Sequence, residues 1–274
     1  MPDTERTTAA APQAPPLRVV DAPPEGWRRA RLVVAYDGSW FHGFAANDGV
    51  TTVQGVLEEA IGRVLRVPVS LVGAGRTDAG VHARAQVVSL DVPADGLDLE
   101  RLKRSVNELC GPAVAVRSAD LAPDDFHARF SAAWRHYRYT IWNDPAPDPF
   151  WAGRAWHVGH PLDLDVLRLA CDPLIGEHDF SSFCKRPRGN DASMVRRVTQ
   201  AGWRAPGDGR LLFDIRATAF CHSMVRSLVG TLVDVGRGKL RAGDVNAILR
   251  ARSRSFAGPV APAHGLCLWE VGYS

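Results

Sequence analysis

The chain has 274 residues, a formal net charge of +3, 46% hydrophobic residues and 23% charged residues, which is ordinary for a water-soluble globular protein. No apolar run is long enough to span a membrane, and the N-terminus lacks the basic-then-apolar order of a signal peptide, so we expect no membrane association. The 5 cysteines are widely spaced and form no Cys-x-x-Cys pair. This argues against a disulfide framework or a zinc ribbon and predicts reduced thiols in the cytoplasm.

Residues 1–27 form a tail rich in alanine and proline that has little to bury, and we expect it to be disordered. Residues 28–125 then alternate between strand and helix patterns. The elements expected in this half are a strand at Arg31–Tyr36, a helix at Val53–Leu65, strands at Val69–Val72 and Gln86–Val92, a helix at Leu99–Leu109 and a strand at Ala113–Val116.

Residues 126–274 repeat this order with one extra helix. The expected elements are a strand at Ser131–Ile141, a helix at Leu164–Leu174, strands at Val195–Arg204 and Arg210–Ala217, helices at Phe220–Val235 and Asp244–Arg252, and a strand at Leu266–Val271. Each half therefore reads β-α-β-β-α-β. We predict an α+β fold of two ferredoxin-like halves, whose antiparallel sheets flank a central RNA-binding cleft.

The loop Gly73–Ala83 carries three glycines, one arginine and one carboxylate between two strand-like segments. Glycines permit sharp turns and close approach of a ligand, and a strand-end loop can present a reactive side chain. Arg76 could hold Asp78 ionised or clamp a phosphate, although a lone Arg-x-Asp pair is more often a structural salt bridge. A dinucleotide fingerprint is disfavoured because this loop runs into a strand rather than opening a helix. Too few carboxylates and sulfurs are present for a calcium or zinc loop.

Other clusters could serve the same cleft. Strand alternation places Arg135, Tyr137, Tyr139 and Ile141 on one face of their strand, where the tyrosines fit either a core or a platform for stacked bases. Arg226 lies among apolar residues of a helix and needs an anionic partner, for which Asp78 is a candidate. His222 beside it is more typical of a structural histidine. Aromatic and basic residues also meet at Phe126–Phe130 and in the loop at Lys185–Asn190.

Taken together, these segments resemble the tRNA pseudouridine synthase A family, from about residue 30 to the C-terminus. The Gly-Arg-Thr-Asp-Ala-Gly-Val-His string is highly specific, and the others follow in the same order. The matching segments are Tyr36–Ser39, Val53–Glu58, Gly75–Ala83, Asp124–Phe130, Tyr137–Tyr139, Phe220–Arg226 and Gly265–Leu268. One segment departs from the pattern, because Gly43–Asn47 stands where many relatives carry Gly-Trp-Gln.

The resemblance implies isomerisation of uridine to pseudouridine at positions 38, 39 and 40 of the tRNA anticodon stem-loop by a homodimer that uses no metal or cofactor. It implies that Asp78 is the essential aspartate and that Arg76, Tyr137, Arg226 and Leu266 bind the substrate. It also implies RNA contacts from Phe126, His127, Ala128, Arg129, Phe130, Lys185, Arg186 and Arg188.

Two questions stay open at this point. Asp78 could attack uracil C6, attack ribose C1′ or remove a ribose 2′ proton. A non-catalytic tRNA-binding module would show the same basic and aromatic surfaces, but it would not need a carboxylate facing the RNA. The retention of Asp78 therefore favours the enzyme.

Overall fold

The computed structural model describes residues 22–185 and 193–273. Residues 1–21 of the predicted tail, and Arg186 and Arg188 of the predicted RNA-binding set, lie outside the described residues. Within the described part of the chain, the first strand begins at Trp27.

The strands and helices follow the predicted order closely. The strands are β1 (Trp27–Tyr36), β2 (Leu71–Gly73), β3 (His82–Pro93), β4 (Val114–Leu121), β5 (Ala132–Trp142), β6 (Trp156–His157), β7 (Gly176–Asp179), β8 (Val195–Arg204), β9 (Arg210–Ala217) and β10 (Leu266–Tyr273). The helices are α1 (Val53–Leu65), α2 (Leu99–Cys110), α3 (Leu164–Leu169), α4 (Met224–Gly236) and α5 (Asp244–Ala251).

The predicted bounds of α1, β8 and β9 are confirmed. Helix α1 begins where predicted because the Thr52 side chain caps it, accepting a hydrogen bond from the Gly55 amide at 3.2 Å. Helix α4 begins at Met224 rather than Phe220, since Ser223 before it has a left-handed backbone with φ of 60°. Strands β6 and β7 were not predicted, because a two-residue strand and a polar one have no apolar alternation.

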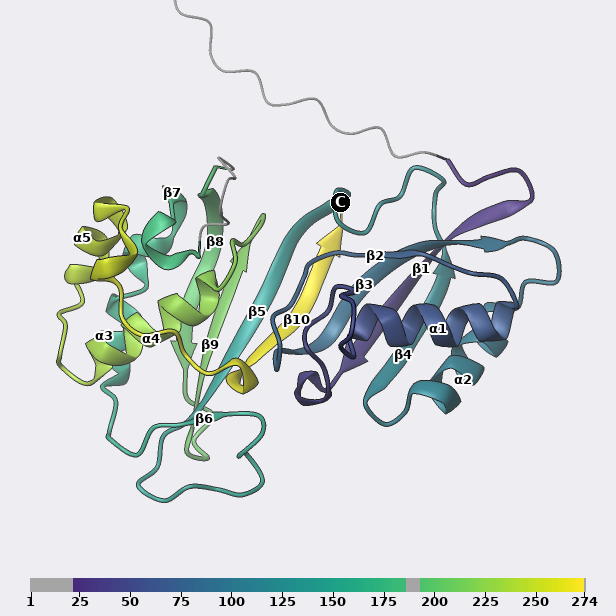
Figure 1. The fold of residues 1–274 in the computed structure, drawn as a ribbon. Helices are drawn as coiled ribbons and strands as arrows, with labels where there is room; N and C mark the ends of the chain where they lie inside the picture. The colour runs from purple at the N-terminus through teal and green to yellow at the C-terminus, as the bar shows by residue number, and fades with distance from the viewer. Residues whose placement is uncertain (1–21, 186–192, 274) are drawn as a thin grey trace, which may run out of the picture.

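The described strands form one continuous sheet in the order β4-β1-β3-β10-β5-β9-β8-β7, with β2 added on β3 and β6 on β5. Strand β10 joins the two halves, because it pairs antiparallel with β5 and parallel with the start of β3. The α+β class is thus correct, but separate sheets for two ferredoxin-like halves are not confirmed. Figure 1 shows α1 and α2 over one end of the sheet and α3, α4 and α5 over the other, with β5 and β10 between them.

The strands that pair with β3 explain where the glycine-rich loop lies. Strand β10 pairs with β3 at His82 and Ala83, whereas β2 pairs with the later residues Val88–Leu90. The chain from β2 to β3 therefore leaves the sheet at the place where the two halves meet. The loop is brought beside β5 and the start of α4, which belong to the second half.

Candidate active site

Polar side chains from neighbouring strands fix the beginning of the loop after β2. Arg135 on β5 is only 8% exposed, and its Nε and Nη2 donate to the Ala74 carbonyl at 3.2 and 2.9 Å. Gln86 on β3 is fully buried and donates to the Gly75 carbonyl at 2.6 Å. Buried polar groups need such partners, so these contacts hold the backbone of the loop in one conformation.

Thr77, the residue before Asp78, is fixed by hydrogen bonds of both its side chain and its backbone. The hydroxyls of Thr77 and Tyr36 are 2.8 Å apart and hydrogen-bonded. The Thr77 carbonyl accepts from the Phe44 amide at 3.1 Å. Gly43 permits this approach, since its φ is +105° and a Cβ there would lie 3.0 Å from the Thr77 oxygen. The Gly43–Asn47 segment therefore packs against the loop and hydrogen-bonds to it, although this segment departs from the family pattern.

His82 fastens the end of the loop to both halves of the molecule. Its Nδ1 accepts a hydrogen bond from the Gly38 amide at 3.1 Å, and its Nε2 lies 3.1 Å from the carbonyl oxygens of Gly153 and His264. This pattern places the proton on Nε2. Burial lowers the pKa of His82 even though the nearby Asp37 carboxylate raises it, so the imidazole is neutral near pH 7.

The loop presents Asp78 to the first turn of α4. Arg226 Nη1 lies 3.1 Å from Asp78 Oδ2, and the Ser223 hydroxyl donates to the same oxygen at 3.4 Å. His222 Nε2 lies 3.4 Å from Oδ1. Arg226 is itself oriented by the Ala261 carbonyl, which accepts from its Nε at 2.8 Å. The predicted pairing of Arg226 with Asp78 is confirmed.

The two carboxylate oxygens of Asp78 differ in their surroundings. Oδ2 accepts hydrogen bonds from Arg226 and Ser223, whereas Oδ1 accepts no hydrogen bond from the residues that the structure describes and has only the His222 imidazole near it, at 3.4 Å. The side chain is 28% exposed. A partly exposed carboxylate with one oxygen that accepts no hydrogen bond can act on a bound molecule as a nucleophile or a base.

Tyr137 supplies apolar surface near this carboxylate, and Leu266 precedes the residue of β10 that pairs with His82 at the end of the loop. Tyr137 is 7% exposed, and its ring meets that of Phe220 edge-on at 4.9 Å. Burial raises the pKa of Tyr137, so its phenol stays protonated at neutral pH. A Cβ on Gly75 would lie 3.7 Å from the Tyr137 hydroxyl, which places the ring against the loop. Leu266, buried at the start of β10, pairs with Tyr139 next along β5.

Arg76 and Lys185 lie at the surface near this centre. The Arg76 side chain is exposed and makes no ion pair or hydrogen bond with any residue in the described ranges. It therefore does not pair with Asp78, whose arginine partner is Arg226. Lys185 is exposed, and its amide donates to the His222 carbonyl at 3.0 Å. Both cations are available to an anionic ligand.

The predicted RNA-binding segment at 126–130 divides into two sets. Phe126 and Ala128 are buried, so their side chains belong to the core. His127 stacks on Phe130 with ring centroids 4.4 Å apart, and the Arg129 guanidinium lies 5.5 Å from the Phe130 centroid. Phe130 is 48% exposed. This set forms a basic and aromatic surface patch.

Sequence reasoning missed the residues that hold the loop. Gln86 and Arg135 are long polar side chains at positions of apolar strands that alternation assigns to the interior. A buried polar residue needs a partner, so this conflict with the pattern was the available signal. Ser223 carries no comparable signal, because its left-handed backbone is not visible in the sequence.

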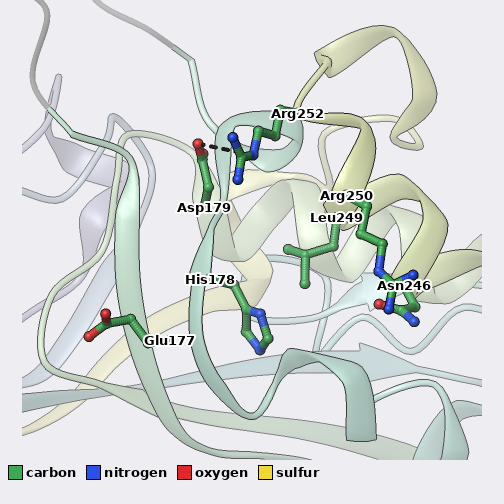
Figure 2. A pocket seen from close by; sticks show the side chains of 7 residues that line it. All are labelled: Glu177, His178, Asp179, Asn246, Leu249, Arg250 and Arg252. Carbon is green, nitrogen blue, oxygen red and sulfur yellow. Dashed lines mark ion pairs between the residues drawn. The ribbon is translucent and has the colours of Figure 1, made fainter. Parts of the chain in front are cut away.

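Within residues 22–185 and 193–273 no group of three or more His, Cys, Asp or Glu residues could hold a metal ion. In the same ranges no helix has the length and apolar character needed to cross a bilayer. A hollow of about 300 Å³ lies between β7 and α5, lined by Glu177, His178, Asp179, Asn246, Leu249, Arg250 and Arg252 (Figure 2). It contains none of the predicted site residues.

The chain is similar to known proteins over most of its length. Residues 32–131 and 170–274 match the family model of tRNA pseudouridine synthase. A protein of Leifsonia xyli named tRNA pseudouridine synthase A is 43% identical over 265 residues, which cover 89% of this chain and 91% of the relative. A protein of the same name from Brevibacillus brevis is 40% identical, with coverage of 90% and 100%. An archaeal box H/ACA Nop10–Cbf5 complex is 15% identical, covering 74% of this chain and 44% of that one, with a TM-score of 0.35.

Proposed function

The chain belongs to the tRNA pseudouridine synthase family and is an isomerase acting on tRNA; from this premise we propose that it converts uridine to pseudouridine in the anticodon stem-loop. The proposed targets are tRNA positions 38, 39 and 40. The proposed reacting group is Asp78, and no cofactor takes part. The observation that carries this proposal is the partly exposed Asp78 carboxylate, which Arg226 holds at Oδ2 while Oδ1 accepts no hydrogen bond from the described residues and lies 3.4 Å from His222.

The chemistry fits such a group. Isomerisation breaks the bond between ribose C1′ and uracil N1, turns the base, and forms a bond between C1′ and C5. The C5 proton leaves and N1 takes up a proton, so there is no net gain or loss of atoms or electrons. An ionised carboxylate can attack C6 or C1′, or it can take a 2′ proton. In each case Arg226 orients the Asp78 carboxylate through the contact at Oδ2, and the Ala261 carbonyl orients Arg226 in turn.

The detached uracil must be retained while it turns. Tyr137 and Leu266 offer apolar surface next to the loop, and a planar ring can pack against either face of the rotating base. The raised pKa of Tyr137 keeps its phenol neutral, so no second negative charge opposes the RNA. Burial of these side chains also keeps water away from the cleaved nucleotide.

Reaching the uridine requires its extrusion from the base stack, which costs a few kcal/mol. Exposed Arg76 and Lys185 can bind phosphates near the extruded nucleotide. The patch at His127, Arg129 and Phe130 can stack on a base and bind the backbone farther away. Phe126 and Ala128 contribute by positioning this patch rather than by touching RNA.

The proposal also covers the fold of the two halves and the oligomeric state. The strand order β4-β1-β3 with β2 beside β3 is matched by β10-β5-β9-β8 in the second half, which supports two ferredoxin-like halves joined into one sheet. The family resemblance further suggests a homodimer. Sedimentation equilibrium of the purified protein would give twice the chain mass if this part of the proposal is correct.

The test is pseudouridine formation on unmodified tRNA transcripts with a chelator present and no added cofactor. Modified positions would be mapped along each transcript, and a transcript with cytidine at positions 38 to 40 would serve as the control. Pseudouridine confined to these positions would support the proposal. Pseudouridine elsewhere would contradict the assigned target, and tRNA binding without any product would favour a non-catalytic binding protein.

A further inference from the structure

Two cysteines meet beside the proposed active site. Cys184 follows the short 3-10 helix Ser181–Phe183, and Cys221 lies three residues before α4. A backbone hydrogen bond from the Lys185 amide to the His222 carbonyl, at 3.0 Å, joins the two segments. Both cysteines are free, and their thiols lie close enough to influence each other's ionisation. The Cys221 thiol also donates to the Met194 carbonyl at 4.0 Å. No zinc or disulfide role was predicted for either.

The two thiols differ in reactivity. The neighbouring Cys184 thiol lowers the pKa of Cys221; burial opposes this shift and the Arg196 charge favours it. The neighbouring Cys221 and burial raise the pKa of Cys184. Cys184 is 5% exposed, whereas Cys221 is only partly buried. Cys221 is thus the more accessible of the two thiols and the one whose thiolate form is favoured, and Cys184 is its buried neighbour.

Cys221 is directly connected to the groups that contact Asp78. His222 and Ser223 follow it in the chain, and each lies 3.4 Å from a carboxylate oxygen of Asp78. Ser223 has a φ of +60°, a strained conformation for a residue with a side chain. Because the three residues are consecutive, a displacement of Cys221 also moves His222 and Ser223.

We propose that Cys184 and Cys221 are a modification site, at which hydrogen peroxide forms a reversible disulfide that lowers the activity of the Asp78 site. The Cys221 thiolate attacks one peroxide oxygen, the O–O bond breaks, and the departing hydroxide takes a proton to become water. Cys184 then attacks the sulfur of the resulting sulfenic acid, the S–O bond breaks, and a second water leaves. Two thiols are oxidised and one peroxide is reduced.

Formation of this disulfide shifts the backbone of Cys221, His222 and Ser223. A covalent S–S bond draws the two sulfurs closer than two unbonded thiols can lie, and the Lys185–His222 backbone bond limits how the strain can be relieved. The movement is transmitted to Ser223 and His222. A shift of about 1 Å in a reacting group can cost about 100-fold in rate. The loss of activity rests on the proposed function, whereas disulfide formation does not.

The test uses the full-length protein treated with a small excess of hydrogen peroxide. Free thiols are alkylated, and the linked peptides are identified by mass spectrometry before and after a dithiol reductant. In wild type we expect a Cys184–Cys221 linkage and a fall in pseudouridine formation of roughly 10- to 100-fold, both reversed by the reductant. Cys184→Ser forms no linkage, and the matched variant Cys171→Ser, at a buried thiol outside the pair, behaves as wild type.

Each part can fail separately. Two freely alkylated thiols after peroxide treatment would overturn the modification site. A linkage that leaves the rate unchanged would overturn the control of activity. If reduced wild type forms no pseudouridine but the linkage still appears, the proposed function fails while the modification site stands.

Discussion

Two aspartates of this molecule pair with arginine but differ in what surrounds them. Asp214 on β9 accepts from His136 Nε2 and Arg138 Nε, both at 2.8 Å, and from Arg204 Nε at 3.2 Å. Its side chain is 14% exposed. Burial raises the pKa of Asp214, but these hydrogen bonds and charges outweigh burial and lower the pKa to about 2. Asp78 lies in a loop, is 28% exposed and pairs with one arginine.

Strand β5 serves both sites from opposite faces. Tyr137 faces the Asp78 loop, whereas His136 and Arg138 on either side of it face Asp214. Both oxygens of Asp214 are occupied by donors, so this carboxylate stabilises the fold and cannot react. Asp78 keeps Oδ1 free of hydrogen bonds from the described residues, with only His222 at 3.4 Å. The contrast is in the number of unused acceptor positions rather than in the presence of an Asp–Arg pair, and this is why Asp78 is the carboxylate proposed to react.

The largest effect is expected from removing the arginine of each pair. Arg226→Gln should lower the rate of pseudouridine formation by about 100-fold or more, because the charge that stabilises and orients Asp78 is lost. Arg138→Gln removes one of three donors to Asp214 and should leave this rate within a few-fold of wild type. Single-turnover assays on one tRNA transcript compare the two. Equal losses would contradict the distinction.

Asp214→Asn should destabilise the folded state by about 2.5 kcal/mol at pH 7, because a carboxyl with a pKa near 2 gains that much over its ordinary value near 3.9. A lowered pKa means that this stabilisation is present above about pH 4 and is lost as the pH falls towards 2. Urea unfolding at pH 7 and pH 3 would show it. A wild-type advantage that grows on acidification would contradict this sign.

Smaller effects are expected from two tyrosines of β5, Tyr137 on the rate of catalysis and Tyr139 on the stability of the fold. Tyr137→Leu should slow catalysis by roughly 10-fold, whereas Tyr137→Phe should keep most of the rate, since the ring rather than the hydroxyl is used. Tyr139 donates to the Pro262 carbonyl at 2.8 Å, so Tyr139→Phe should cost about 1 kcal/mol of stability. Rates and unfolding free energies measured on all three variants check this. Inactivity of Tyr137→Phe would assign chemistry to its phenol.

The smallest effect concerns Arg76, which has no ion-pair partner among the described residues. Arg76→Ala should weaken tRNA binding and reduce the slope of log Kd against log salt by about 1, the value for one phosphate contact. The unfolding free energy should not change. A salt titration of binding measures the slope, and an unchanged slope would show that Arg76 does not contact phosphate.

The pairing of Asp78 with Arg226 could be predicted from the sequence for a physical reason. Arg226 lies in the most apolar helix, and a buried cation requires an anion, which pointed to Asp78. The Asp214 cluster could not be found in this way, because it depends on the register that sets Arg138 opposite Asp214 across two strands. The pairing of β10 with β3 depends on contacts between distant residues as well. Helix α1, by contrast, follows from local spacing and capping.

The most direct measurement of the central claim compares Asp78→Asn with Asp214→Asn in single-turnover pseudouridine formation, at a temperature where both variants are folded. The account predicts no detectable product with Asp78→Asn, unchanged tRNA binding by that variant, and a rate near wild type with Asp214→Asn. Product formation by Asp78→Asn within about tenfold of wild type would show that another group carries out the reaction.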